Sequence, residues 1–169
     1  MSTLNVTTIQ DSAGAFEHAR LVQVANVMKA TMVTGTTLMI ADDTIPQNDE
    51  GIELMTLAIT PKHDDNQLLI EVVIASVDNG NANYVFAALF QDSTSNALAS
   101  CGGIHMPADG ARNISFSHFI DGSIGTSSTT FKVRAGCNGS GTTTFNGRTG
   151  ATRMGGTLAS SITISEIRV

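Results

Sequence analysis

The residue types that most often do chemistry are few in this sequence and lie far apart. Its four histidines, His18, His63, His105 and His118, each stand without the neighbouring nucleophile and acid that a catalytic group needs. The sequence has no phosphate-binding glycine loop, no G-x-S-x-G motif and no H-E-x-x-H motif. A single histidine among apolar residues, as at His118, is more often packed than a metal ligand. We therefore expect no enzyme and no cofactor.

Acidic pairs and two thiols are the remaining candidates for a reactive or ion-binding group. Asp42, Asp43 and Asp49 share one stretch, and Ca²⁺ prefers such loop oxygens, but their spacing is not that of an EF-hand. We expect solvated loops and no bound metal. Cys101 and Cys137 each lie beside glycine near the end of an apolar run, so we interpret both as structural. Their spacing leaves a disulfide between them open.

The charge of the chain excludes several classes of partner. Its net charge is −6, and no two of its nine basic residues are adjacent, which argues against nucleic-acid binding. No apolar run approaches the roughly 20 residues of a membrane span, so no membrane insertion is expected. The segment after Met1 lacks the pattern of a signal peptide, which favours folding in a reducing cytoplasm.

The elements that would position any site are short strands. A length of 169 residues is that of one domain. Short apolar runs alternate with turns rich in Gly, Asn and Pro, which is typical of an all-β, antiparallel two-sheet sandwich or barrel. The predicted strands are 21–28, 36–41, 52–60, 67–77, 83–91, 97–104, 112–120, 129–136, 142–147 and 160–168.

Two of these runs, 67–77 and 83–91, are apolar on both faces. A sandwich covers only one face of each sheet, so something else must cover the other. A partner subunit, a long loop and an unrecognised helix are the three candidates. We expect a partner subunit, because a second copy on a symmetry axis is the simplest cover. The predicted interface residues are Leu69, Val73, Ala75, Val85, Ala87 and Leu89.

Residues 1–18 differ from the rest of the chain. Leu4, Val6 and Ile9 are their main apolar residues, and a turn at 11–14 separates them from the first long strand. We interpret 1–18 as an extended N-terminal arm and 19–169 as the β-sandwich domain. The alternative is an ordinary edge strand with a frayed start.

Several segments carry a resemblance to a known group of proteins. They are MSTLNVTTIQDSAG, Ala58-Ile-Thr-Pro61 through Leu68-Leu-Ile70, NYVFAALFQDSTSNALA, and TTTFNGRTG followed by GGTLASSITISEI. Together they resemble small tail-fibre and virion-surface proteins of tailed phages, of the marine and cyanobacterial type. The resemblance implies a jelly-roll sandwich, similar to C1q and tumour-necrosis-factor heads, that assembles as a homotrimer. It also implies that the arm, through Leu4, Val6 and Ile9, anchors the domain to other virion proteins.

Three functions fit these observations. The first is a virion structural protein, assembled in the host cytoplasm, that forms a homotrimeric surface knob or fibre tip. Such a tip would bind a host surface glycan or protein, or other virion proteins, and threefold display would strengthen weak contacts. The alternative is a capsid decoration or head-fibre protein that attaches to the shell and stabilises it. A cellular trimeric signalling or lectin-like module is disfavoured by the missing signal-peptide pattern.

Overall fold

The protein is all-β in the part of the chain that the structure describes. The computed structural model describes residues 10–11, 14–15, 20–108 and 110–168. Within these ranges the only helical element is a single 3₁₀ turn at Met154–Gly156, with no α-helix. None of these residues belongs to a helix long and apolar enough to cross a membrane.

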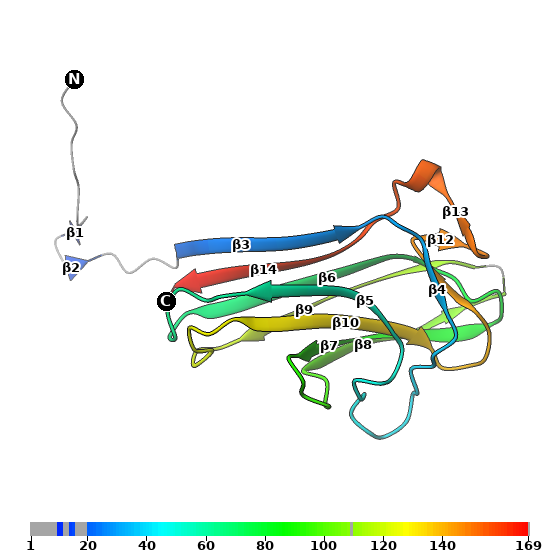
Figure 1. Cartoon of the computed structure of the whole chain (residues 1–169), viewed down its shortest axis with the longest axis horizontal. Helices are drawn as coiled ribbons and strands as arrows, with labels where there is room; N and C mark the ends of the chain where they lie inside the picture. Colours follow the sequence, from blue (N-terminus) through cyan, green and yellow to red (C-terminus); the bar gives the residue numbers. More distant parts are fainter. Residues whose placement is uncertain (1–9, 12–13, 16–19, 109, 169) are drawn as a thin grey trace.

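Eight principal strands form two antiparallel four-stranded sheets (Figure 1). The first sheet has the order β3-β14-β6-β9 and the second has the order β5-β10-β7-β8. Numbered one to eight along the chain, the strands run 1-8-3-6 and 2-7-4-5, which is the order of a jelly roll. The predicted two-sheet antiparallel sandwich is confirmed. The bounds are β3 Arg20–Lys29, β5 Ile52–Ile59, β6 Gln67–Val77, β7 Asn83–Gln91, β8 Ala99–Met106, β9 Arg112–Ile120, β10 Thr129–Cys137 and β14 Ser160–Arg168.

Shorter strand pairs complete the structure. β4 (Val33–Gly35) pairs with β11 (Thr143–Phe145), and β12 (Gly147–Arg148) pairs with β13 (Ala151–Thr152). β4, β12 and β13 lie at the same end of the sandwich in Figure 1. β1 (Gln10–Asp11) pairs with β2 (Gly14–Ala15), as a turn at 11–14 requires. The predicted anchor residues Leu4, Val6 and Ile9 lie outside the described residues, and the division into arm and domain stays a prediction.

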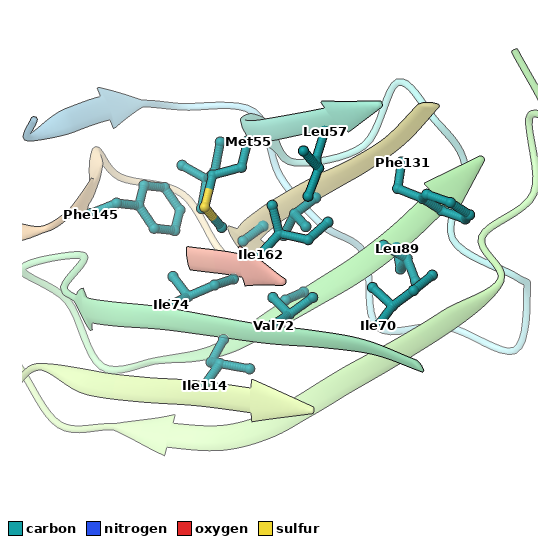
Figure 2. Close-up of a cluster of buried hydrophobic side chains, with 14 of the residues drawn as sticks. Met55, Leu57, Ile70, Val72, Ile74, Leu89, Ile114, Phe131, Phe145 and Ile162 are labelled. Atoms are coloured by element: carbon teal, nitrogen blue, oxygen red, sulfur yellow. The ribbon is translucent and has the colours of Figure 1, made fainter. Parts of the chain in front are cut away.

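The core lies between the two sheets, as period-2 alternation dictates. Alternate residues of β6, such as Leu68, Ile70 and Val72, are fully buried and face the second sheet. Figure 2 shows side chains from both sheets meeting in this layer, with Phe145 of β11 at one side. Burying each such side chain contributes roughly 1.5–3 kcal/mol, which makes this layer the main source of stability.

A buried carboxylate fastens the last strand. Glu166 of β14 is fully buried and accepts hydrogen bonds from the backbone N–H of Lys62 (2.7 Å) and from the side-chain amides of Asn66 and Gln23. Burial raises the pKa of Glu166, but these donors, together with the backbone of His63, outweigh it and hold the pKa below its ordinary value. The network ties β14 to β3 and to the turn before β6.

One predicted strand is wrong. Residues 36–41 form no strand but begin a long loop that reaches residue 51. Their apolar composition suits a strand, yet Met39 instead inserts as a single side chain against Phe90 and Ala88 on the outer face of the second sheet. Tertiary packing has overridden the local β-propensity here.

Candidate assembly surface

The histidines do not converge on a site. His63 and His105 are exposed, and His118 is half-buried on the inner side of β9. His18 lies outside the described residues. Among those described, no three His, Cys, Asp or Glu side chains lie close enough together to hold a metal ion. In the same part of the chain, every buried polar side-chain atom has a hydrogen-bond partner, so none is left pointing toward a missing ligand.

The acidic loop residues are exposed, and Asp42 makes hydrogen bonds within its own loop. Asp42 is exposed, and its carboxylate accepts hydrogen bonds from the hydroxyl (2.6 Å) and the backbone N–H (2.8 Å) of Thr44, which lower its pKa. It borders an open hollow of about 460 Å³ together with residues 43–46 and 97–100. Asp43 and Asp49 are also exposed. These contacts describe a loop turn, not an ion site.

A second hollow, of about 370 Å³, lies between residues 78–81, 141–142, 144 and 149–150. Asp78 is buried at its edge and accepts hydrogen bonds from the backbone N–H groups of Thr149 (2.7 Å) and Gly80 (3.3 Å). Its carboxylate is thus occupied in joining two loops, and the hollow presents no free buried charge to a ligand.

Both cysteines are free thiols. Cys137 is fully buried in β10, and burial raises its pKa, which disfavours the reactive thiolate. Cys101 is half-buried on β8, where its Sγ lies 3.8 Å from the carbonyl oxygen of Ser115. Among the described residues, neither thiol belongs to a group of three His, Cys, Asp or Glu side chains.

The protein's own loop 36–51 covers part of the outer face of the second sheet. Met39, which is only 1% exposed, packs on Ala88 and Phe90 of β7. Gly136 of β10 allows this close approach, because a Cβ there would lie 3.0 Å from the carbonyl oxygen of Thr37. Of the three covers expected for the apolar outer side of 83–91, the loop is the one present.

Arg134 of β10 holds this loop in place. Its Nε donates to the carbonyl oxygen of Glu50 (2.7 Å), and its Nη2 donates to that of Gly51 (2.8 Å). Its Nη1 lies 3.4 Å from the Glu53 carboxylate. The backbone N–H of Met39 also donates to Cys137 (3.1 Å). The cover is therefore fixed by both packing and hydrogen bonds.

The outer face of the first sheet has no such cover among the described residues. We call it the open face. Five of the large apolar side chains that remain exposed lie on it, and they are Leu21, Val24, Met28, Val73 and Phe119. Exposed apolar patches larger than a few hundred Å² are characteristic of interaction surfaces. The contrast with the second sheet makes the open face the candidate functional surface.

The strand register orders the open face into rows that run across the four strands. Each row takes one outward residue from β3, β14, β6 and β9 in turn. The rows are Met28–Ser161–Val73–Ser115, Asn26–Thr163–Glu71–Ser117 and Val24–Ser165–Leu69–Phe119. The middle row is polar and contains a carboxylate, whereas both flanking rows contain large apolar side chains. The open face is thus banded along the strand direction.

The six predicted interface residues fall into two groups. Leu69 and Val73 (43% exposed) lie on the open face, and Ala75 is half-buried near the end of β6. The other three, Val85, Ala87 and Leu89, are fully buried in the core of the single chain, so they are not available to line an axis between subunits. Period 2 divided each strand correctly into two faces, but it could not say which face of β7 points inward.

The sequence reasoning missed the residues that β3 and β9 contribute. Val24 and Met28 lie on the outward side of β3, and Phe119 follows two exposed serines on β9. A signal for Phe119 was present in the alternation of 112–120, where it lies in phase with Ser115 and Ser117 on the polar side. A large apolar residue on the same face of a strand as polar residues indicates that this face contacts more than solvent.

Comparison with known proteins gives little beyond the fold. No family model and no curated protein matches the chain. Among solved structures, a protein of infectious bursal disease virus (Gt strain) is similar over 100% of this chain and 42% of the viral chain, at 12% identity and a TM-score of 0.43. The sugar-binding EclA C-terminal domain is similar over 96% of this chain and 89% of the EclA chain, at 13% identity and a TM-score of 0.37. The enzymatically active domain of tailspike protein 4 of bacteriophage CBA120 is similar over 75% of this chain and 19% of the tailspike chain, at 13% identity and a TM-score of 0.27. The chain thus spans less than half of the virus and tailspike proteins, and similarities this distant say nothing about function.

Proposed function

We propose that this protein is a non-enzymatic structural subunit of a tailed-phage virion, displayed at the particle surface as a homo-oligomeric knob or fibre tip. The observation that carries the proposal is the open face. The protein's own loop packs on part of the outer face of one sheet, while the other presents Leu21, Val24, Met28, Val73 and Phe119 to its surroundings. A subunit that assembles with other copies needs such a surface, and an isolated globular protein does not.

The state of the chemical groups supports a structural role. The buried acids Asp78 and Glu166 are engaged in loop and strand contacts, and the buried thiol of Cys137 is held in its less reactive form. The histidines of the described residues are dispersed. What remains for function is surface recognition, by the open face and by the loops at the ends of the sandwich.

The assignment to a phage surface rests on the sequence resemblance of segments spread over nearly the whole chain. In that setting the arm 1–18 attaches the domain to other virion proteins, and the loops bind a host surface glycan or protein. Several copies on one particle would convert weak contacts into useful avidity. The net charge of −6 favours neither nucleic acid nor membrane as the partner.

Immunogold labelling of particles from the source phage tests the proposal. An antibody against the purified protein should label the tail tip at low copy number. Dense label over the head would favour the alternative, a capsid decoration protein that stabilises the shell. Particles that carry no label, although infected cells contain the protein, would contradict a virion role altogether.

A further inference from the structure

The open face has a ridge and a groove side by side along its centre. β14 contributes only small side chains to it, Ser161, Thr163 and Ser165, whereas the adjacent β6 contributes the larger Leu69, Glu71 and Val73. β3 and β9 flank these two strands on either side. A ridge beside a groove of equal length can pack against a copy of itself, provided that the copy is turned to bring ridge onto groove.

We propose that a second copy of this chain packs on the open face about a twofold axis that runs parallel to the strands, between β14 and β6. This inference rests on the proposed function, of which it names the subunit contact. It replaces the threefold axis expected from the sequence, because half of the residues expected to line that axis lie in the core.

The twofold brings complementary residues together. Rotation about this axis places β6 over β14 of the second copy and β3 over β9, while each row stays at its own height. Leu69 and Val73 then lie on the small side chains of Ser165 and Ser161 of the second copy. Two sheets packed in this aligned way lie about 10 Å apart, which suits a large residue facing a small one.

The same rotation pairs the outer strands and the polar row. Val24 meets Phe119 of the second copy, so two of the exposed apolar side chains cover each other. Glu71 meets Thr163, whose hydroxyl already accepts a hydrogen bond from Asn26 (2.8 Å) and can direct its own proton to the carboxylate. A buried carboxylate requires such a donor.

The size of the face is sufficient for a specific contact. Four strands about 4.8 Å apart and about nine residues long at about 3.4 Å per residue span roughly 19 Å by 30 Å, or about 600 Å² of flat sheet. Side-chain relief increases the accessible area toward the roughly 800 Å² per partner of a standard interface.

Light scattering on the full chain is the first test. The expected mass is twice the chain's 17.6 kDa. Val73→Asp should shift the protein to monomer by placing a charge on the ridge. Thr56→Asp is the matched control, because Thr56 is exposed on the outer face of the second sheet and lies outside the contact. A wild-type monomer at all concentrations, a trimer, or a dimer that persists in Val73→Asp would overturn the inference.

Cross-linking between two variants tests the orientation. In a Cys101→Ser background, proteins carrying Val24→Cys and Phe119→Cys are mixed and treated with a short bis-maleimide, because faces about 10 Å apart exceed the reach of a disulfide. A heterodimeric product is expected. The mixture of Met28→Cys and Phe119→Cys is the control, since these residues lie four positions, or about 14 Å, apart along the strands.

Equal yields from the two mixtures would overturn the parallel twofold even in a dimeric protein. That failure is distinct from failure of the proposed function. An oligomer that uses another surface can still be a virion subunit, and particle labelling decides that question independently of any contact on the open face.

Discussion

Replacing the buried carboxylate of Glu166 by an amide should destabilise the sandwich strongly. Glu166→Gln keeps the shape of the side chain but removes its charge. The carboxylate accepts from Lys62, Asn66 and Gln23, and its site is fully buried. Glutamine has one acceptor oxygen and an NH₂ group, so at least one of these donors will face another donor.

The expected loss can be worked out from these contacts. A hydrogen bond to a charged group contributes about 1.5–3 kcal/mol, and a buried donor left without an acceptor costs about 1–3 kcal/mol. Because the three donors share one carboxylate, the contributions are not independent, and we expect a net loss of about 2–4 kcal/mol in the free energy of unfolding.

Urea denaturation of wild type and variant, followed by circular dichroism, measures this loss as a lower midpoint. The pKa of Glu166 is lowered in the folded state, so its stabilisation is fully present above the unfolded pKa, which is the ordinary 4.5 of a glutamate, and is lost as the pH falls through the folded pKa. The difference between the proteins should therefore hold at pH 7 and shrink in acid below about pH 4.

The control is Glu53→Gln, which makes the same chemical change at an exposed carboxylate that lies 3.4 Å from Arg134. Surface pairs of this kind contribute about 0–1 kcal/mol. A loss below about 1 kcal/mol for Glu166→Gln at pH 7, or a difference that is unchanged at pH 3, would refute the reasoning about the buried network.

Four further predictions concern the loop, the arm and the chemistry. Met39→Ala should cost about 2–5 kcal/mol of unfolding free energy, whereas Met154→Ala, at an exposed position outside the open face, should cost under about 1 kcal/mol; thermal melts of both distinguish them. Gly51→Ala should lower the melting temperature, because its φ is +63° and a Cβ would lie 2.9 Å from the Ala135 backbone; an unchanged melt would contradict this. Deleting 1–14 should leave the β-sheet circular dichroism intact but prevent incorporation into particles, and loss of the spectrum would refute a separate arm. The purified protein should turn over neither glycan nor phosphoester substrates, and an activity that a single histidine substitution abolishes would end the non-enzymatic assignment.

Much of the sandwich could be predicted from alternation and turns. The bounds of 67–77, 83–91 and 112–120 coincide with β6, β7 and β9. These runs are rich in β-branched, aromatic and other apolar residues, and each is followed by an aspartate that begins a turn, so local sequence and tertiary packing agree. The segment 36–41 has similar composition but lies in a loop, because its position over Phe90 depends on Arg134, nearly one hundred residues away.

The candidate surface was harder to predict for a physical reason. When both faces of a strand are apolar, as in 83–91, alternation cannot tell which one points to the core. Small alanines at 87 and 88 make the two faces of β7 nearly equivalent, and only the loop that carries Met39 decides between them. Which residues share a row on the open face depends on the register between strands that are distant in sequence. The sequence of a single strand does not contain this register.

Methionine oxidation tests the central claim, that the open face is an assembly surface. Met28 on the open face and Met154 in the 3₁₀ turn are almost equally exposed in the single chain, at 70% and 73%. Dilute peroxide should therefore oxidise both at similar rates when the protein is dilute. As the concentration rises, or when the protein is incorporated into particles, Met28 should become protected while Met154 does not. Equal rates for the two residues under every condition would contradict an assembly role for the open face.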